Sequence, residues 1–263
     1  MLALKVPLKE AQQAKEFLSK TKFYDFSRRI AKTKTTLYYP VKKKEKMPWP
    51  VVQKKLEAIA HPEKTLKAAL AGKLTKKEHE LLMSSHDVVG TIAIIEIPPE
   101  LQKKEKLIAK TLLQLRPSLK TVLKKSGIHE GEFRTQKLTY IAGEKTKEAR
   151  YVENGCTFLL DVEKVYFSVR LAHERLRIVR LVKLGECVLV LFSGCAPYPV
   201  VLAKHTRAAE ILGIELNPVG HAYGLKNLKL NHVKNVQLIC GDAAKELHNL
   251  AKAGKTFDRI LMP

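Results

Sequence analysis

The last third of the chain alternates short apolar segments with segments of helical character. The apolar segments are CVLVLFS, EILGIELN, VQLICGD and FDRILMP, and the stretches YPVVLAKHT, PVGHAYGLKNLKLNHV and AAKELHNLAKAG lie between them. Repeated strand–helix units predict a parallel sheet with covering helices, and continuously apolar strands are typical of a sheet buried on both faces. This alternation therefore predicts an α/β domain with four parallel strands over residues 181–263.

The residues before this domain divide into three parts. Residues 1–41 contain LALKVP, EAQQAKEFLSK and TTLYYPV, which predict a strand, a helix and a strand in a small α+β module. Residues 42–84 begin with the charged, proline-broken KKKEKMPWP and stay lysine-rich, which favours a basic linker with helices. Residues 85–180 predict an α+β middle domain, with a hairpin-type turn at Asn154–Gly155.

The charge of the chain points to a polyanionic partner. The chain has 48 Lys and Arg residues against 26 Asp and Glu, a net charge of +22. Such an excess favours nucleic acid or an anionic membrane surface, although a solvated lysine-rich surface is the simpler alternative. No apolar run approaches the ~20 residues of a membrane span, and no signal segment begins the sequence. We therefore expect a cytoplasmic, nucleic-acid-binding protein with no membrane partner.

The cysteines argue against a metal site. Cys156, Cys187, Cys195 and Cys240 are far apart, and no two form a CxxC pair. Widely spaced cysteines are typical of reduced thiols in a protein without a zinc site or disulfides. We therefore expect no bound metal.

Three features follow successive strands of the predicted sheet. FSGCAPYP contains Gly194 and Ala196, which leave room for a ligand beside the backbone, provided that the φ angle of Ala196 is negative. Glu215 ends the second strand, where an acid can accept hydrogen bonds from both hydroxyls of a ribose. Asp242 follows the third strand and could accept from an adenine amino group. Each acid alone could simply cap a helix, but together they predict a cofactor that contains adenosine.

The same domain lacks the motifs that bind phosphates. No GxGxxG follows the first strand, and no GxxxxGK[ST] occurs in the chain. A cofactor with ribose and adenine but without phosphates points to S-adenosyl-L-methionine.

These strand-end motifs, preceded by GEFRTQKL and ENGCTFLLDVEKVYFSVRLAHERLRI, resemble a known family. They are similar to archaeal/eukaryotic-type tRNA (guanine-37 N1)-methyltransferases and the related aminocarboxypropyl transferases of the wybutosine pathway. The resemblance covers nearly the whole chain, and VYFSVRLAHERLRI is its most specific part. It implies an N-terminal RNA-binding module, a middle domain with catalytic residues and a Rossmann-like methyltransferase domain. It also implies methyl transfer from S-adenosyl-L-methionine to N1 of guanine 37 in tRNA.

The resemblance also implies roles for individual residues. Glu174 would be the general base that removes the N1 proton, and Arg134 would stabilise negative charge on guanine O6. By itself, AHERLRIVR is typical of an ordinary solvated helix face, so the role of Glu174 depends on the surrounding block. The implied cofactor contacts are Tyr166, Arg175, Phe192, Ser193, Gly194, Ala196, Glu215, Leu216, Asn217, Asp242, Ala243 and Pro263.

Two features depart from the family pattern. Val190 and Ala196 stand where many members have an acid and a second glycine, and the sequence stops at Pro263, inside a loop that the family continues. A sheet that ended there would leave an apolar edge. We therefore expect the domain to be truncated after its fourth strand or completed by a second polypeptide. Three functions stay open: guanine methylation, aminocarboxypropyl transfer, and tRNA binding without catalysis.

Overall fold

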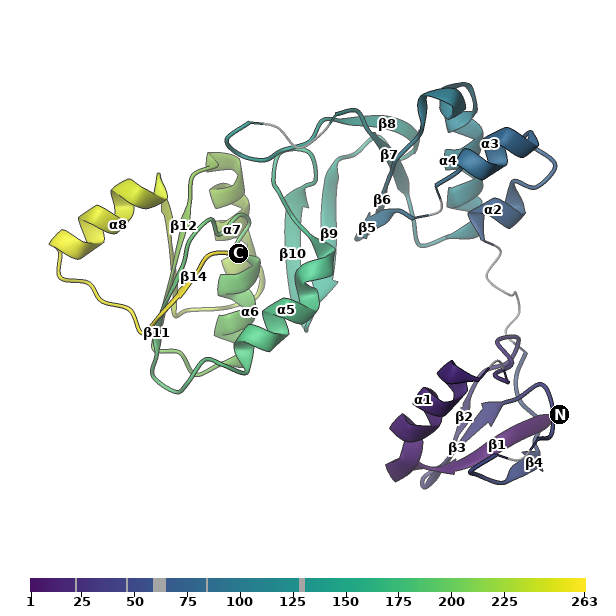
Figure 1. The fold of residues 1–263 in the computed structure, drawn as a ribbon. Coiled ribbons are helices and arrows are strands. Elements are labelled where there is room, and N and C mark those ends of the chain that lie inside the picture. Colours follow the sequence, from purple (N-terminus) through teal and green to yellow (C-terminus); the bar gives the residue numbers. More distant parts are fainter. Residues whose placement is uncertain (22, 46, 59–64, 84, 128–130) are drawn as a thin grey trace. The chain divides into compact units, whose positions relative to one another are not determined.

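The computed structural model describes residues 1–263 except 22, 46, 59–64, 84 and 128–130 (Figure 1). The chain divides into two compact units, Met1–Thr65 and Leu66–Pro263. In the described part of the chain, no helix has both the length and the apolar character needed to cross a membrane.

The described residues of the first unit form a four-stranded sheet with one α-helix. The elements are β1 (Leu2–Pro7), α1 (Ala11–Lys20), β2 (Ala31–Lys32), β3 (Thr36–Pro40) and β4 (Val51–Gln53), and the sheet order is β2-β3-β1-β4. The predicted strand–helix–strand is confirmed. The sheet extends past the expected module boundary at residue 41, because β4 pairs antiparallel with β1 and Ala3 lies opposite Val52. A three-residue strand after a proline-rich stretch gives little period-2 signal, so the sequence did not reveal it.

The second unit begins inside the segment that was expected to be a linker. Its first helices are α2 (Leu66–Ala69) and α3 (Lys76–Leu81). Leu66, Leu70 and Leu82 are buried in one cluster with residues of α4 (Glu105–Leu115). The leucines pack inward while the lysines remain in solvent, so residues from Leu66 onward belong to the folded unit.

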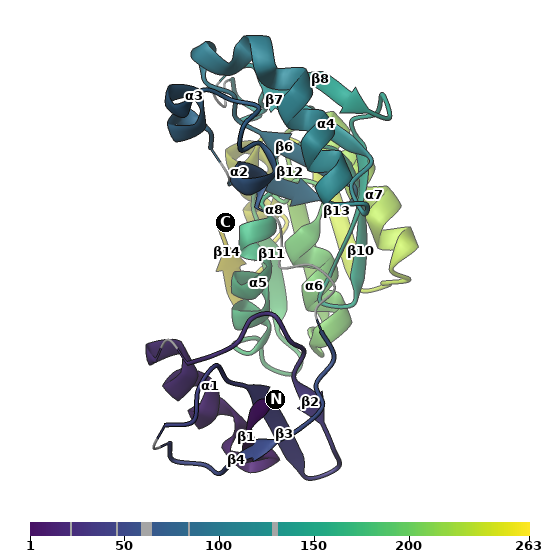
Figure 2. The ribbon, with the colours of Figure 1, turned by 90° about the vertical axis from the view of Figure 1, so that its right-hand side faces the viewer.

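A second sheet follows these helices. It consists of β5 (Asp87–Val89), β6 (Ile92–Ile95), β7 (Thr121–Lys125) and β8 (Leu138–Gly143), in that order. β6 and β7 are parallel and are connected through α4, whereas the other pairs are antiparallel. In Figure 2 the helices α2, α3 and α4 lie in front of this sheet. Residues of its other face, such as Ile92 and Leu123, join the core that the next hairpin forms.

The strands β9 (Glu148–Glu153) and β10 (Cys156–Asp161) form the predicted hairpin. Its turn residues Asn154 and Gly155 have φ angles of 49° and 69°, as a type I′ turn requires. Cys156, Phe158 and Leu160 alternate toward the core and are fully buried there.

The Rossmann-like part confirms the predicted alternation. Its elements are α5 (Ala172–Val179), β11 (Cys187–Val190), α6 (Pro197–His205), β12 (Glu210–Glu215), α7 (Pro218–Leu230), β13 (Val236–Cys240), α8 (Ala243–Lys252) and β14 (Arg259–Leu261). The four strands are parallel, in the order β13-β12-β11-β14. Leu189 and Leu212 pack against α8, whereas Val188 and Ile211 pack on the side of α5 and α6. The sheet therefore lies between helical layers (Figure 1).

Asn227 of α7 and Asn231, the residue that follows α7, join the hairpin to this domain. Asn231 accepts a hydrogen bond from the backbone N–H of Thr157 at 2.8 Å and donates to its carbonyl at 2.7 Å. Asn227 accepts from the N–H of Leu159 at 2.7 Å and donates to its carbonyl at 3.1 Å. Asn227 also donates to the carbonyl of Cys195 at 2.9 Å. These amides satisfy the edge of β10 as a neighbouring strand would.

Replacement of Asn227 by alanine should destabilise the second unit. The amide is fully buried, and its loss would leave a buried N–H and buried carbonyls without partners, at about 1–3 kcal/mol for each unsatisfied group. We expect the free energy of unfolding in urea to fall by roughly 2–4 kcal/mol. The exposed Asn249 of α8 is the matched control, because Asn249→Ala should change stability by less than about 0.5 kcal/mol. Equal stabilities of the two variants would contradict the bridging role.

Candidate functional site

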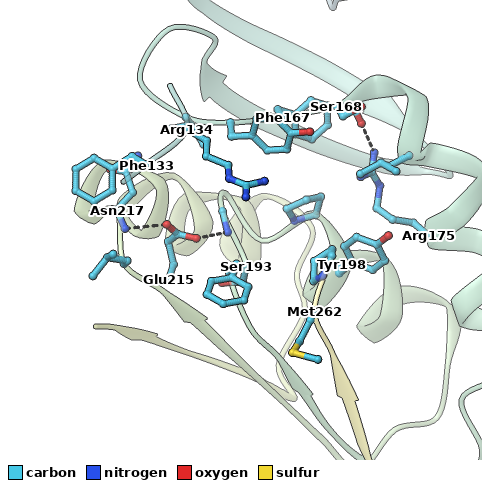
Figure 3. Close-up of a pocket in the computed structure, with 18 of the residues that line it drawn as sticks. Phe133, Arg134, Phe167, Ser168, Arg175, Ser193, Tyr198, Glu215, Asn217 and Met262 are labelled. Atoms are coloured by element: carbon cyan, nitrogen blue, oxygen red, sulfur yellow. Dashed lines mark hydrogen bonds between the residues drawn. The ribbon is translucent and has the colours of Figure 1, made fainter. Parts of the chain in front are cut away.

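A cavity lies beside the carboxyl ends of β11, β12 and β14. Its volume is about 510 Å³, and its lining comes from segments far apart in the sequence. One wall is the connection between β10 and α5, including Tyr166, Phe167 and Ser168. The opposite side is formed by the loop after β11, by Glu215 and the residues after it, and by the end of the chain (Figure 3). The cavity is where an open parallel sheet is expected to bind a ligand.

The loop between β11 and α6 has a strained backbone. Phe192, Gly194 and Ala196 have φ angles of 53°, 55° and 64°, all in the left-handed region. The condition of a negative φ at Ala196 is not met, because the chain turns from strand to helix within six residues through alternating left-handed positions. A left-handed conformation costs an alanine about 1–2 kcal/mol. Strain of this kind is often found at ligand sites.

The same loop contributes predicted residues to the cavity. Phe192, Ser193 and Gly194 line it, whereas Ala196 is fully buried in the core behind the loop. Burial raises the pKa of the neighbouring Cys195 thiol to about 12, so this cysteine is not a nucleophile.

Glu215 is held by backbone groups. One carboxylate oxygen accepts from the N–H of Gly194 at 2.5 Å, and the other accepts from the N–H of Asn217 at 2.7 Å. Figure 3 shows both bonds at the floor of the cavity. Each carboxylate oxygen retains a further acceptor position. The carboxylate is therefore fixed in place and able to accept hydrogen bonds from two ligand hydroxyls.

Of the other predicted residues at the strand ends, some line the cavity and some do not. Leu216 and Asn217 line the cavity, and Asn217 also caps α7 by accepting from the N–H of Val219 at 3.0 Å. Asp242 caps α8 by accepting from the N–H of Lys245 at 2.9 Å, and its side chain is outside the lining. Ala243, the first residue of α8, packs against the apolar cluster that includes Leu189 and Leu212. The structure therefore does not bring Asp242 and Ala243 to the cavity that Glu215 lines.

Arg134 lines the cavity on the side that lies across from Glu215 (Figure 3). Its guanidinium extends over the cavity in Figure 3, between Phe167 and the loop after β11. The residue has a φ angle of 48°, which is uncommon for a residue with a side chain. Phe133 beside it is 41% exposed, Tyr166 is 49% exposed and Phe192 is 58% exposed, although all three line the cavity. Exposed aromatic rings at a cavity mouth are surfaces on which a base can stack.

Glu174 is not part of the cavity lining. Its carboxylate accepts two hydrogen bonds from Arg177, at 2.7 Å and 2.6 Å, on the outer side of α5. These hydrogen bonds hold the pKa of the Glu174 carboxyl below its usual value. The next residue, Arg175, does line the cavity.

Arg175 is held in a buried ion pair. The side chains of Arg175 and Glu153 are 2% and 3% exposed. Arg175 donates to the Glu153 carboxylate at 2.5 Å and 2.8 Å, and to the carbonyl of Ser168 at 3.0 Å. Its guanidinium also lies over the rings of Phe167 and Tyr198. Arg175 therefore organises the cavity wall through protein contacts.

Several lining residues were not found by sequence reasoning. Phe133, Ser168, Tyr198 and Met262 line the cavity beside the predicted Pro263. A single sequence carries no signal for Glu153 either, because its partner lies 22 residues away. No group of three or more possible metal ligands occurs among the described residues.

Two protein-family models match the chain. The TRM5/TYW2 methyltransferase domain matches residues 149–263, and the TYW2 N-terminal domain matches residues 66–146. The first of these covers most of the cavity, and the second covers the helices and sheet that precede the hairpin.

Characterised relatives extend the match over the full chain. The tRNA (guanine(37)-N(1))-methyltransferase Trm5b of Pyrococcus abyssi is 36% identical over 261 residues, which are 99% of this chain and 76% of that protein. The tRNA (guanine(37)-N(1))/4-demethylwyosine(37)-methyltransferase Taw22 of Nanoarchaeum equitans is 43% identical over 169 residues, 63% of this chain and 55% of that protein. The solved structure of the complex of aTrm5 and tRNALeu matches with a TM-score of 0.62 and 29% identity, covering 90% of this chain and 74% of that chain.

The agreement therefore includes the sequence, both family models and the fold. A relative with 36% identity matches 99% of this chain and 76% of its own length. The chain belongs to the TRM5/TYW2 methyltransferase family.

Proposed function

We propose that this chain is an S-adenosyl-L-methionine-dependent tRNA methyltransferase that modifies N1 of guanine 37. The observation that carries this proposal is the single cavity lined by both the fixed carboxylate of Glu215 and the guanidinium of Arg134. A relative that is similar along nearly the whole chain is named for this reaction.

The cavity fits a cofactor that contains a nucleoside. Glu215 can accept from two ribose hydroxyls while it keeps its two backbone hydrogen bonds. The buried hydroxyl of Ser193 has no hydrogen-bond partner within the described structure, and Ser193 lines the cavity. That hydroxyl lies beside Gly213 of β12, so Ser193 borders the ligand space through its other atoms. S-adenosyl-L-methionine supplies a methyl group on a positively charged sulfur.

Arg134 and the exposed aromatic residues suit the guanine. A base that leaves its stack can lie against Phe133 or Tyr166 at the mouth of the cavity. Arg134 then donates to O6, where negative charge develops as N1 loses its proton. A guanidinium presents planar hydrogen-bond donors that suit such an oxygen.

Glu174 is the residue we assign as the acceptor of the N1 proton. Its carboxylate points to Arg177 in this structure, so this role requires the side chain to leave Arg177 and turn toward the cavity. Arg175, the next residue of α5, lines the cavity, so Glu174 lies on a turn of the helix that borders it.

The first unit is proposed to bind phosphates of the same tRNA. An open cavity of that unit is lined by Arg28, Lys54 and Lys55, together with Gln53 and Leu56. Clustered cations that face solvent are typical of phosphate contacts.

Labelled cofactor tests the proposed function directly. The full chain is incubated with tRNA that carries guanine 37 and with S-adenosyl-L-methionine labelled in the methyl group or in the aminocarboxypropyl chain. Methyl label at N1 that is lost in Glu174→Gln would support the proposal. Label only from the aminocarboxypropyl chain would favour the alternative transfer. Binding of tRNA without any incorporation would indicate a non-catalytic protein.

A second acceptor nucleoside is suggested by the names of two relatives, Taw22 and Taw21. Taw22 of Nanoarchaeum equitans, with 43% identity over its match, is named for both guanine and 4-demethylwyosine. The same assay with tRNA that carries 4-demethylwyosine at position 37 decides whether this chain shares the second activity.

Glu215→Gln should weaken cofactor binding. The amide keeps the size of the side chain but loses the charge and places a donor where a backbone N–H now donates. A hydrogen bond to a charged group contributes about 1.5–3 kcal/mol, so we expect a Kd for S-adenosyl-L-methionine that is roughly 10–100 times higher by calorimetry. Glu210→Gln at the other end of β12 removes a charge that pairs with Lys255 and should leave Kd unchanged. Equal effects of the two substitutions would refute the ribose-binding role.

Substitution of one residue of the buried Glu153–Arg175 ion pair should change the stability differently from substitution of both. Glu153→Gln leaves the Arg175 charge buried without its partner, which should lower the free energy of unfolding by about 3–5 kcal/mol. Replacement of both residues by methionine removes both charges and should restore most of that stability. Thermal unfolding of the three proteins measures this, and a double variant as unstable as Glu153→Gln would contradict the expectation.

The proton-accepting role of Glu174 predicts a shift in the pH profile. Arg177 lowers the pKa of Glu174, so Arg177→Gln should raise that pKa toward its usual value. Because a general base acts in its ionised form, the acidic limb of the kcat/KM profile should move to higher pH in the variant. Arg180→Gln, one position past the end of the same helix, is the control. An acidic limb that does not move in Arg177→Gln would exclude Glu174 as the titrating base.

A further inference from the structure

A second cavity adjoins the first. Its volume is about 270 Å³, and it lies between the strands of the β5–β8 sheet and the connection that leads into α5. Arg134, Val165, Tyr166, Phe167 and Ser168 line both cavities. The two cavities therefore adjoin along this segment and beside Arg134.

The second cavity carries an excess of positive charge. Lys125, Arg134 and Arg170 line it, and Asp87 is the acid among its described lining residues. Arg170 donates to Asp87 at 3.1 Å and 2.8 Å, and the Lys125 ammonium is 3.9 Å from Glu96, which is outside the lining. The ion pair of Arg170 is exposed and that of Lys125 is long, so an anionic ligand can compete for both cations.

The ion pair between Arg170 and Asp87 can be exchanged for a ligand contact. The side chain of Arg170 is 76% exposed, and that of Asp87 is 31% exposed. Exposed ion pairs contribute little stability, so a phosphate group can compete for the guanidinium. Arg170 is therefore available to a ligand in a way that the buried Arg175 is not.

We propose that the second cavity binds the ribose-phosphate unit next to the methylated guanosine, with Lys125 and Arg170 as its phosphate-binding cations. This inference rests on the proposed function. A ligand that spans two adjoining cavities must be a chain of linked units, and RNA is a chain in which every link is anionic. Thr135 and Gln136 also line the second cavity and supply polar groups for a ribose hydroxyl.

The test compares charge variants with a chemically altered RNA. The full chain and its variants Lys125→Gln and Arg170→Gln are titrated with a synthetic anticodon stem–loop by fluorescence anisotropy at several salt concentrations. Each variant should bind several-fold more weakly, with a salt dependence reduced by about one charge. Lys110→Gln, at an exposed position of α4 that lines neither cavity, is the matched control. Affinity for S-adenosyl-L-methionine should stay unchanged in all three.

Stem–loops with one uncharged backbone linkage identify which phosphate of the RNA contacts the second cavity. Stem–loops with a methylphosphonate on the 5′ or the 3′ side of guanosine 37 should bind the wild-type chain more weakly in one of the two cases. In that case Lys125→Gln and Arg170→Gln should show no further loss, because the contact is already absent. Additive losses, or variants that bind as Lys110→Gln does, would overturn the proposal.

A last variant separates binding from structural support. Asp87→Asn breaks the ion pair but leaves the Arg170 charge, so RNA affinity should be retained or increased. A loss equal to that of Arg170→Gln would show that the pair only supports the fold, which would overturn the proposal. Absence of methylation by the wild-type chain would instead contradict the proposed function, whereas the binding measurements would still decide the role of the second cavity.

Discussion

The position of the cavity depends on how α7 binds the edge of β10. Asn227 and Asn231 are four residues apart on a helix, a rise of about 6 Å, and they bind Leu159 and Thr157, which are two residues apart on a strand, about 6.7 Å. The near match allows two amides to satisfy a strand edge without a further strand. Because Asn227 also binds the carbonyl of Cys195, one side chain connects the hairpin, the helix and the loop of the cavity.

The ion pair of Glu153 and Arg175 adds a second connection to the same wall. Glu153 ends β9, whereas Arg175 belongs to α5 and binds the carbonyl of Ser168 between them. A buried charge pair gains little over apolar packing, but it strongly disfavours arrangements in which either charge loses its partner. The segment that contains Tyr166 and Phe167 lines both cavities, and these contacts hold it in one position.

Local patterns predicted the sheet and helices well, whereas contacts between distant segments could not be predicted. A run of apolar residues, and an acid such as Glu215 at its end, can be recognised from residues that are close in the sequence. The predicted alternation of strands and helices was therefore confirmed element by element. The contact of Asn227 with Leu159 spans 68 residues, and nothing in either segment indicates the other. The left-handed φ of Ala196 was missed because alanine rarely adopts it, and only the surrounding packing imposes it. The helices before residue 84 were expected to be linker because their lysine content concealed the spacing of Leu66 and Leu70.

The two proposed catalytic residues differ in whether their side chains already line the cavity. Arg134 already lines the cavity, so stabilisation of charge on guanine O6 needs no rearrangement. Glu174 remains with Arg177, where its lowered pKa makes it a weak proton acceptor. Removal from that cation and transfer to a less hydrated cavity would both raise the pKa. Under the proposed roles, the carboxylate therefore becomes a stronger base as it approaches the guanine, and side-chain rotation couples binding of the base to removal of its proton.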